Sequence, residues 1–426
     1  MDRHSLIKKI IDFIIFQIKA IRRDGFLQKA RQFWKITFTA LWTFVRIVPI
    51  ICKAIPLILA VRVLRPLITI RFGSIDSSRL GHFAFHTEIY LCNRDAGLDN
   101  NQTYDIFYYD RSVCNQQLKI MWDRLLHINS LSKYLQLVNR CLPGHEPHEI
   151  NLTTARDVLG LFERIPAHLN FTAEEEEQGQ KALREMGIPE GAPFICFHNR
   201  DSVYLSTVSP HIEWNYHDYR DSSIYNFIPA MEELTSRGYY AIRMGAFVKE
   251  EIASTNPMLI DYSTKYRNDF MDIFLTAKCY FYIGDPCGLH TLPTIFRRPF
   301  ATTNSIQFEH LISWFPNKLL ILKKLFLRKE NRLMTFREII ESNVGKFDNT
   351  LQFEEAGIEI ISNTPEEITD LAIEMDERLK GTWQASEEDE WLQKRFWSFF
   401  NNSELHGKIV SRAGAEFLRQ NRALLD

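Results

Sequence analysis

The second half of the chain alternates short apolar runs with longer stretches of helical periodicity. The apolar runs predict strands at 194–197, 239–244, 280–283, 299–304 and 357–362. Apolar positions three and four residues apart predict helices at 224–237, 269–278, 291–296 and 365–379. Because strands and helices alternate, we predict a parallel, doubly wound α/β sheet in this half.

The preceding part of the chain shows a similar pattern. It predicts strands at 67–72 and 103–109, a helix ending near 91, and helices at 114–126, 130–141 and 153–164. A further helix should begin after Thr172, since Thr172 and Glu175 have the spacing of a capping box, and should end at Gly187. The Gly- and Pro-rich stretch 187–193 then predicts a boundary between two α/β domains.

Residues 1–66 differ from the rest in being apolar and basic at once. Their apolar positions have helical spacing, and lysines, arginines and three prolines interrupt every long apolar run. No charge-free run reaches the roughly 18 residues of a spanning helix. We therefore expect amphipathic helices that lie in the cytoplasmic leaflet, with Trp34 and Trp42 as anchors. A single imperfect span, or helices packed on a soluble core, remain as alternatives.

The last part of the chain, 381–426, contains an aromatic segment and a predicted helix at 411–425. Aromatic residues at this spacing, such as Phe396 and Trp397, indicate packing rather than a sugar platform. We expect these C-terminal helices to pack back on the N-terminal domain. The predicted division is a membrane-association segment 1–66, a Rossmann-like acceptor domain 67–190, a Rossmann-like donor domain 191–380 and the C-terminal helices 381–426.

Charge is unevenly distributed along the 426 residues. The formal net charge is −2, yet residues 1–71 hold 14 Lys+Arg against 3 Asp+Glu, or +11, so the remainder carries −13. Because the positive charge lies in an apolar arm rather than along a polar groove, the pattern favours an anionic membrane surface and excludes nucleic acid as partner. Seven cysteines without a CxxC spacing predict reduced thiols, a cytoplasmic setting and no zinc site.

Two polar loops follow predicted strands of the second half. His198, Arg200 and Asp201 come after 194–197, while Asp285, Gly288, Leu289 and His290 come after 280–283. Open α/β sheets bind ligands at the carboxyl ends of their strands. An arginine fork and a glycine-led helix start both suit a diphosphate, so we predict a shared anion site. The alternatives are an ion pair of Arg200 with an acid and an ordinary turn at Gly288.

Further candidate donor-binding residues lie in neighbouring loops: Tyr219, Arg220, Arg243, Gly245 and Asn304. Arg243 follows a strand and should reach the nucleotide, although an ion pair with an acid of the same domain is the alternative. Asp221, beside Arg220, is equally suited to be an N-cap.

The general base should come from the N-terminal domain, because the acceptor approaches from there. His82 is the leading candidate, since histidine exchanges protons near neutral pH, and Asp76 and Glu88 are the alternatives. His82 could also be a capping or core histidine. No DxD-type carboxylate cluster requires a divalent cation, so we expect neither a metal nor another cofactor.

The motifs resemble those of a group of bacterial glycosyltransferases of surface-polysaccharide biosynthesis. The matching pieces are ArgLeuGlyHis at 79–82, HisAsnArgAsp at 198–201 with Tyr204, TyrArgAsp at 219–221, ArgMetGly at 243–245, GlyLeuHis at 288–290 and Asn304. This resemblance implies a GT-B-like fold, in which two Rossmann-type doubly wound domains face a cleft. It also implies nucleotide-sugar binding in the second domain and acceptor binding in the first.

Two more distant resemblances concern single elements. Residues 285–292 are similar to the anion-binding loop of heptosyltransferases, and 198–201 to the HisXaaArg element with which fucosyltransferases hold a GDP diphosphate. Heptosyltransferases have Asp-Thr-Gly in that loop, whereas this chain has Asp285-Pro286-Cys287-Gly288. The identity of the sugar therefore does not transfer.

Together these observations predict metal-independent transfer of a sugar from a nucleotide sugar to a lipid-linked saccharide, as in lipopolysaccharide or capsule synthesis. The enzyme would be attached peripherally to the inner face of the cytoplasmic membrane. Two other functions remain compatible with the pattern: a nucleotide-sugar epimerase or other transferase on the same scaffold, and a non-catalytic, membrane-attached polysaccharide assembly subunit.

Overall fold

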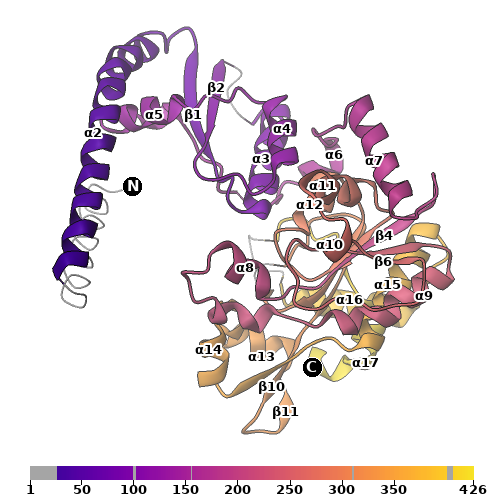
Figure 1. The fold of residues 1–426 in the computed structure, drawn as a ribbon. Coiled ribbons are helices and arrows are strands. Elements are labelled where there is room, and N and C mark those ends of the chain that lie inside the picture. Colours follow the sequence, from indigo (N-terminus) through magenta and orange to yellow (C-terminus); the bar gives the residue numbers. More distant parts are fainter. Residues whose placement is uncertain (1–25, 99–101, 155, 309–310, 401–405) are drawn as a thin grey trace. The chain divides into compact units, whose positions relative to one another are not determined.

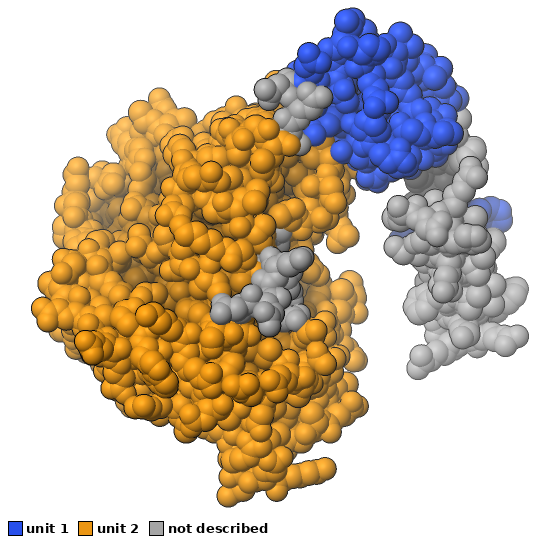
Figure 2. Space-filling view, turned by 180° about the vertical axis from the view of Figure 1, so that it is seen from behind, with its two compact units in different colours: residues 1–72, 102–104, 131–149 blue, residues 73–101, 105–130, 150–426 orange. Residues whose placement is uncertain are grey.

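The computed structural model describes residues 26–98, 102–154, 156–308, 311–400 and 406–426. The chain forms two compact units (Figures 1 and 2). Unit 1 consists of residues 1–72, 102–104 and 131–149, and unit 2 of residues 73–101, 105–130 and 150–426. The expected boundaries at 66 and 190 differ from this division, because most of 67–190 belongs to the same unit as the C-terminal half.

Unit 2 is built on a seven-stranded sheet of order β13-β9-β8-β7-β4-β5-β6, in which all paired strands are parallel. Its strands are β4 (Phe194–His198), β5 (Tyr240–Arg243), β6 (Leu259–Asp261), β7 (Tyr282–Gly284), β8 (Phe300–Ser305), β9 (Lys318–Leu322) and β13 (Arg412–Ala413). From β6 to β9 this is the Rossmann order, with the topological switch point between β4 and β7. The prediction of a doubly wound sheet in this half is therefore confirmed.

The side chains of successive residues in β4 point into two different hydrophobic clusters. Ile195 and Phe197 of β4 belong to one hydrophobic cluster, and Phe194 and Cys196 to the other. Burial on both faces explains why β4 reads as a continuous apolar run rather than an alternating one. The first cluster is covered by helices that include η3 (Ile224–Phe227), α9 (Ile228–Ser236) and α15 (Pro365–Lys380). Figure 1 shows α9 and α15 opposite α11 and α12 across the sheet.

The second cluster brings together helices from both halves of the chain. They are α3 (Leu80–Asp95), α4 (Gln116–Asp123), α6 (Leu161–Arg164), α7 (Ala173–Glu185), α10 (Tyr262–Lys265), α11 (Asp269–Lys278) and α12 (Thr291–Ile295). Of the first four, α3 packs against α12, α4 and α7 pack against α11, and α6 packs against α3. They thereby join the helices over this face of the seven-stranded sheet, where a separate N-terminal Rossmann-like sheet was expected. Residues 67–190 contribute three short strands, β1 (Thr69–Ile75), β2 (Thr103–Tyr109) and β3 (Glu149–Ile150), in the order β2-β1-β3.

The C-terminal residues complete the first face of the sheet. Phe396 and Trp397 of α16 (Glu387–Ser398) and Phe417 of α17 (Ala415–Gln420) lie in the same cluster as Phe197. Strand β13 pairs with β9, and η6 (Arg422–Leu425) ends the chain. The aromatic segment is core, as predicted. These helices were expected on the N-terminal domain, whereas α16 and α17 lie in the hydrophobic cluster of the C-terminal sheet and β13 extends its edge.

A separate antiparallel sheet of order β11-β10-β12 lies in unit 2. It consists of β10 (Lys324–Leu327), β11 (Arg332–Leu333) and β12 (Ile358–Ile361), so the strand predicted at 357–362 exists but belongs to this sheet. The remaining elements of unit 2 are α8 (Val203–Val208), η2 (Asn215–Arg220), α13 (Phe336–Glu341), η5 (Val344–Lys346) and α14 (Thr350–Glu355).

Unit 1 contains the helix α2 (Phe26–Val63), which continues past Pro49 and Pro56, together with α5 (Ser132–Arg140) and η1 (Glu146–His148). Arg62 joins α2 to α5, since its Nε donates to Asn139 Oδ1 at 3.1 Å. In the described part of the chain, no helix has the length and apolar content needed to cross a membrane. The predicted helix over 1–31 lies largely outside the described residues.

Candidate functional site

The loops after β4 and β7 meet at the switch point. His198 is in register with Gly284, and a Cβ on Gly284 would lie 2.3 Å from the carbonyl oxygen of His198. Beyond this pair, the backbone nitrogen of Arg200 donates to Asp285 Oδ2 at 2.9 Å. The two polar loops that the sequence singled out are therefore adjacent in space.

Asp285 is the centre of this arrangement and is fully buried. Its carboxylate accepts hydrogen bonds from Ser222 Oγ at 2.5 Å, Thr303 Oγ1 at 2.8 Å and Asn304 Nδ2 at 2.8 Å. The left-handed backbone of Asn304 (φ 50°) lets its N–H reach Asn363 Oδ1 at 2.6 Å. Asp285 and Asn304, both predicted to bind donor, thus hold the loops together from below the surface.

Arg200 makes the ion pair that was the alternative to an anion site. Its Nη1 contacts Asp221 and donates to the carbonyl oxygen of His217 at 3.2 Å. Nε and Nη2 have no partner among the described residues. Burial, followed by the nearby charge of Arg220, lowers the pKa of Arg200 to about 10. The Nη1 donor is thus committed to Asp221 and to the backbone of His217.

Other cations surround the same loops. Arg220 donates through Nη2 to the carbonyl oxygen of Pro286 at 2.8 Å, and Lys323 donates to the carbonyl oxygen of Asp221 at 2.6 Å. Neither Arg220 nor the exposed Arg79 has a carboxylate partner within the part of the chain that the structure describes.

These cations raise the local positive potential. Burial and the charges of Arg220, Arg200 and Arg79 lower the pKa of His217 to about 4. Burial likewise lowers the pKa of Lys323 to about 8, with Asp285 opposing the shift and the two arginines adding to it. An anionic ligand would relieve this repulsion.

The glycine-led helix start contributes less than expected. Helix α12 has only five residues, so its macrodipole is small. The hypothesis of an anion site therefore depends on the side-chain cations. Gly288 is exposed, while Leu289 and His290 are half-buried. A Cβ on Gly288 would lie 3.1 Å from the backbone nitrogen of Gly81, so the start of α3 packs directly against this turn.

Helix α3 and the loop before it present a histidine and a carboxylate beside that turn. His82 Nδ1 lies 2.8 Å from Asp76 Oδ2, and Asp76 Oδ1 accepts from Ser78 Oγ at 2.8 Å. Burial tends to raise the pKa of Asp76, but the hydrogen bonds from His82 and Ser78 outweigh it, so the pKa is lowered. Two residues predicted as alternatives for the base therefore form one pair, in which the ionised Asp76 orients His82.

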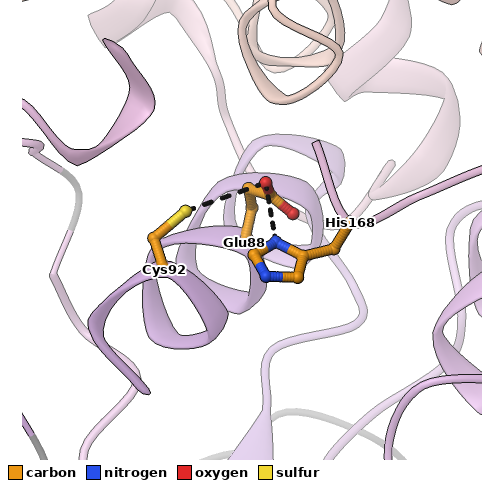
Figure 3. A group of neighbouring side chains, drawn as sticks. All are labelled: Glu88, Cys92 and His168. Atoms are coloured by element: carbon orange, nitrogen blue, oxygen red, sulfur yellow. Dashed lines mark hydrogen bonds and ion pairs between the residues drawn. The ribbon is translucent and has the colours of Figure 1, made fainter. Parts of the chain in front are cut away.

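Glu88, the third candidate base, is fully buried in an ion-pair network (Figure 3). Its Oε1 lies 2.6 Å from Arg297 Nη2 and 3.1 Å from His168 Nδ1. Glu88, Cys92 and His168 lie close enough together to hold a metal ion. Arg297 Nη2 also lies 3.3 Å from Cys92 Sγ, and burial raises the pKa of this thiol to about 12. In this structure the guanidinium of Arg297 supplies the positive charge next to Glu88 and Cys92.

Four other predicted donor residues support the loops. Arg243 Nη1 is buried against Asp261 at 3.2 Å, which is the ion pair that was the alternative for it. Gly245 has a φ of 148°. The buried ring of Tyr219 stacks on that of Phe353, with the ring centroids 5.5 Å apart. Asp201 accepts backbone hydrogen bonds from Val203 and Lys249, both at 3.0 Å. These contacts shape the loops around the switch point.

Several residues at the site were not predicted. Ser222 and Lys323 hold the loops, Arg79 adds a cation, and Cys287 lies 3.5 Å from His198. Arg79 lies in the ArgLeuGlyHis motif and Cys287 in the loop 285–292 that the sequence singled out, but neither residue was assigned a role. Lys323 follows β9, a strand that the pattern did not predict.

No protein-family model and no curated protein matches the chain. Among solved structures, it is similar to ADP-heptose LPS heptosyltransferase II of E. coli, at 10% identity and TM-score 0.34 over 59% of this chain and 90% of that one. It is also similar to a family 9 glycosyl transferase of Veillonella parvula, at 10% identity and TM-score 0.41 over 72% and 97% of the two chains.

A third similar structure is the iron-containing dodecameric glycosyltransferase TibC of enterotoxigenic E. coli, at 12% identity and TM-score 0.31 over 58% and 63% of the chains. All three are glycosyltransferases, the class that the motifs resemble. With TM-scores below 0.5, the likeness supports no further statement about this chain.

Proposed function

We propose that the protein is a glycosyltransferase that moves a sugar from a nucleotide-sugar donor to a saccharide acceptor. The observation that carries the proposal is the meeting of a cation cluster with the His82–Asp76 pair at the switch point of the sheet. Arg79, Arg200, Arg220 and Lys323 form the cluster. Gly81 contacts Gly288, so the base candidate lies next to the turn that follows β7.

In this proposal the cations bind the diphosphate of the donor. Negative charge grows on the diphosphate as the glycosidic bond breaks, and Arg220, Arg79 and Arg200 stabilise it. Because these side chains supply the positive charge, we propose a reaction that needs no metal.

The acceptor hydroxyl would lose its proton to His82. Asp76 accepts from Nδ1, which leaves Nε2 as the proton acceptor. The arrangement is compatible with inversion or retention at the sugar, since the acceptor position is not part of it.

The test of donor binding uses isothermal titration calorimetry on the full-length protein with UDP, GDP, ADP and CMP sugars. We expect one of them to bind, and Arg220→Ala to weaken binding about tenfold or more, because it removes a charge-assisted contact. Arg328→Ala, at an exposed arginine directly after β10, is the matched control and should leave the affinity unchanged. Absence of binding by every donor would overturn the proposal.

Product analysis separates the proposed transferase from the two alternative functions. An epimerase would convert the nucleotide sugar without an acceptor, whereas a glycosyltransferase requires one. An assembly subunit would support polysaccharide synthesis in the cell even as the His82→Asn variant.

We further propose that unit 1 attaches the enzyme to the cytoplasmic face of the membrane, where a lipid-linked acceptor would lie. On α2, Ala54 and Ile58 are buried, whereas Ile55, Leu59 and Val63 are exposed at i, i+4 and i+8. The side chain of Val63 is 77% exposed. An apolar helix face within a segment of charge +11 suits an anionic lipid surface.

Vesicle sedimentation of the full chain tests this attachment. We expect binding to vesicles that contain phosphatidylglycerol, weaker binding at high salt, and at least a tenfold loss for Leu59→Glu/Val63→Glu. Leu351→Glu, at an exposed leucine of unit 2, is the control and should bind normally. Equal binding of the double variant and the control would contradict the assignment.

A further inference from the structure

Cys287 lies in the turn between β7 and α12, directly before Gly288. Its Sγ is 3.5 Å from His198 Nδ1 at the end of β4. Its backbone nitrogen donates to His290 Nδ1 at 2.9 Å. Both Cys287 and His198 are half-buried. The proposed transfer reaction uses neither the thiol nor this imidazole as a reacting group.

The surroundings of Cys287 favour its thiolate. Burial tends to raise its pKa, but the charges and hydrogen bonds of His198 and His290 outweigh this and lower it well below the ordinary value. The pKa of His198 is raised in turn, since burial is opposed by Cys287 and Asp285. The titratable and charged groups that act on this pair from all elements around it are His198, Arg200, Arg243, Tyr282, Asp285 and His290.

Among the described residues, no other cysteine sulfur has a hydrogen bond with a histidine, although Cys92 has the Arg297 guanidinium at 3.3 Å. Burial raises the pKa of Cys92 and of Cys114 to about 12. Cys52 and Cys141 are exposed, and Cys196 and Cys279 are buried in the core. Cys287 therefore combines partial exposure with a histidine at its sulfur, which is the environment of a reactive thiol.

We propose that Cys287 and His198 form a thiolate–imidazolium pair, and that low-molecular-weight disulfides and electrophiles modify Cys287. In the reaction with a disulfide RS–SR, the Cys287 thiolate attacks one sulfur, the S–S bond breaks, and RS⁻ leaves with the electron pair. The thiol proton resides on His198. Since Gly288 and Pro286 flank Cys287, and Arg220 binds Pro286, the adduct would fill the proposed diphosphate site. Blocking of the diphosphate site by the adduct rests on the proposed function, whereas the reactivity of Cys287 does not.

Alkylation of the full-length protein by iodoacetamide, followed by peptide mass spectrometry, tests the reactivity. At pH 7 we expect Cys287 to react at least tenfold faster than the exposed Cys141 of the same sample. Its rate should change little between pH 7 and 9, while that of a free thiol measured alongside, reduced glutathione, should rise steeply. In His198→Asn the pH dependence of Cys287 should become like that of the free thiol. An alkylation rate of Cys287 equal to or below that of Cys141 at pH 7 would overturn the proposal. This comparison uses the wild-type protein, so it holds whether or not the variant folds.

Repeating the measurement with glutathione disulfide, and with the nucleotide sugar that binds, separates the two proposals. Formation of a mixed disulfide at Cys287 supports the modification site, and its absence contradicts it. Slower alkylation in the presence of bound donor supports the location of Cys287 at the diphosphate site. Fast alkylation that no donor slows would retain the reactive pair and contradict only the blocking of the proposed site.

Discussion

The hydrogen bond between His82 and Asp76 illustrates how single residues determine the chemistry of this protein. Asp76 is held by Ser78 from one side and by His82 from the other. Because its pKa is lowered by these bonds, the carboxylate remains charged and keeps Nδ1 of His82 as a donor. Glu88 differs from Asp76, because its buried carboxylate pairs with Arg297 and His168.

The first prediction concerns this pair. His82→Asn should lower the kcat of sugar transfer by about 10²- to 10⁴-fold, since it removes the general base. Asp76→Asn should lower kcat less and alter its pH profile, because the histidine remains but loses its orienting carboxylate. Steady-state kinetics across pH 5–9, with donor affinity measured separately, checks both. His145→Asn, in unit 1, is the control, and activity of His82→Asn equal to the control would exclude His82 as base.

At the scale of elements, capping and charge pairing explain how the N-terminal helices attach to the sheet unit. Thr172 and Glu175 form the capping box of α7 that their spacing predicted. Glu175 has a second task, because it accepts from Gln117 Nε2 of α4 at 2.6 Å and from Arg124 Nη1 at 2.9 Å. The local signal was visible in the sequence, and the contact with α4 was not.

We expect Glu175→Gln to destabilise the protein in a pH-dependent way. The hydrogen bond from Arg124 outweighs burial and lowers the pKa of Glu175 to about 2, from an ordinary value of 4.5. A lowered carboxyl pKa stabilises the folded state above pH 4.5, and that stability is lost as the pH falls toward 2. The variant should lose on the order of 2 kcal/mol at pH 7 and converge with the wild type near pH 2.

Urea unfolding at a series of pH values measures this difference. Glutamine can still cap the helix, so the loss reports the charge rather than the cap. Glu174→Gln, in the same turn, is exposed and should have little effect. A loss that stays constant with pH would show that the ion pair is not its cause.

At the largest scale, unit 2 is organised around one sheet whose two sides take helices from distant parts of the chain. Helices α3, α4, α6 and α7 join α11 and α12 on one side, although they precede the first strand of that sheet. The C-terminal residues cover the other and add β13 beside β9. Consequently residues 73–101 and 381–426 belong to the same folding unit, despite their separation in sequence.

The last prediction tests this arrangement. Phe396 of α16 is fully buried against Phe336, with ring centroids 5.4 Å apart. Phe396→Ala should lower the free energy of unfolding of unit 2 by about 3–5 kcal/mol, because it leaves a cavity in the main core. Trp391→Ala, at an exposed position of the same helix, should cost much less. Equal melting temperatures of the two variants in calorimetry would argue that α16 does not belong to this core.

The sequence by itself determined features that depend on local physics. Apolar runs marked β4, β7 and β8, spacing marked the capping box of α7, and helix α11 was predicted at its observed bounds, 269–278. Polar loops after buried strands also placed His198, Arg200, Asp285 and His290 at one edge of the sheet, because parallel strands end at a common edge.

Only the tertiary structure decided which elements pack together and which side chains form ion pairs. Short strands such as β6 and β13 lack a distinctive run and exist because a neighbouring strand supplies their hydrogen bonds. Whether an arginine faces a ligand or an acid depends on which side chains long-range packing brings to it. Thus Arg243 forms an ion pair with Asp261, and Arg200 forms one with Asp221. Arg220 has no carboxylate partner among the described residues.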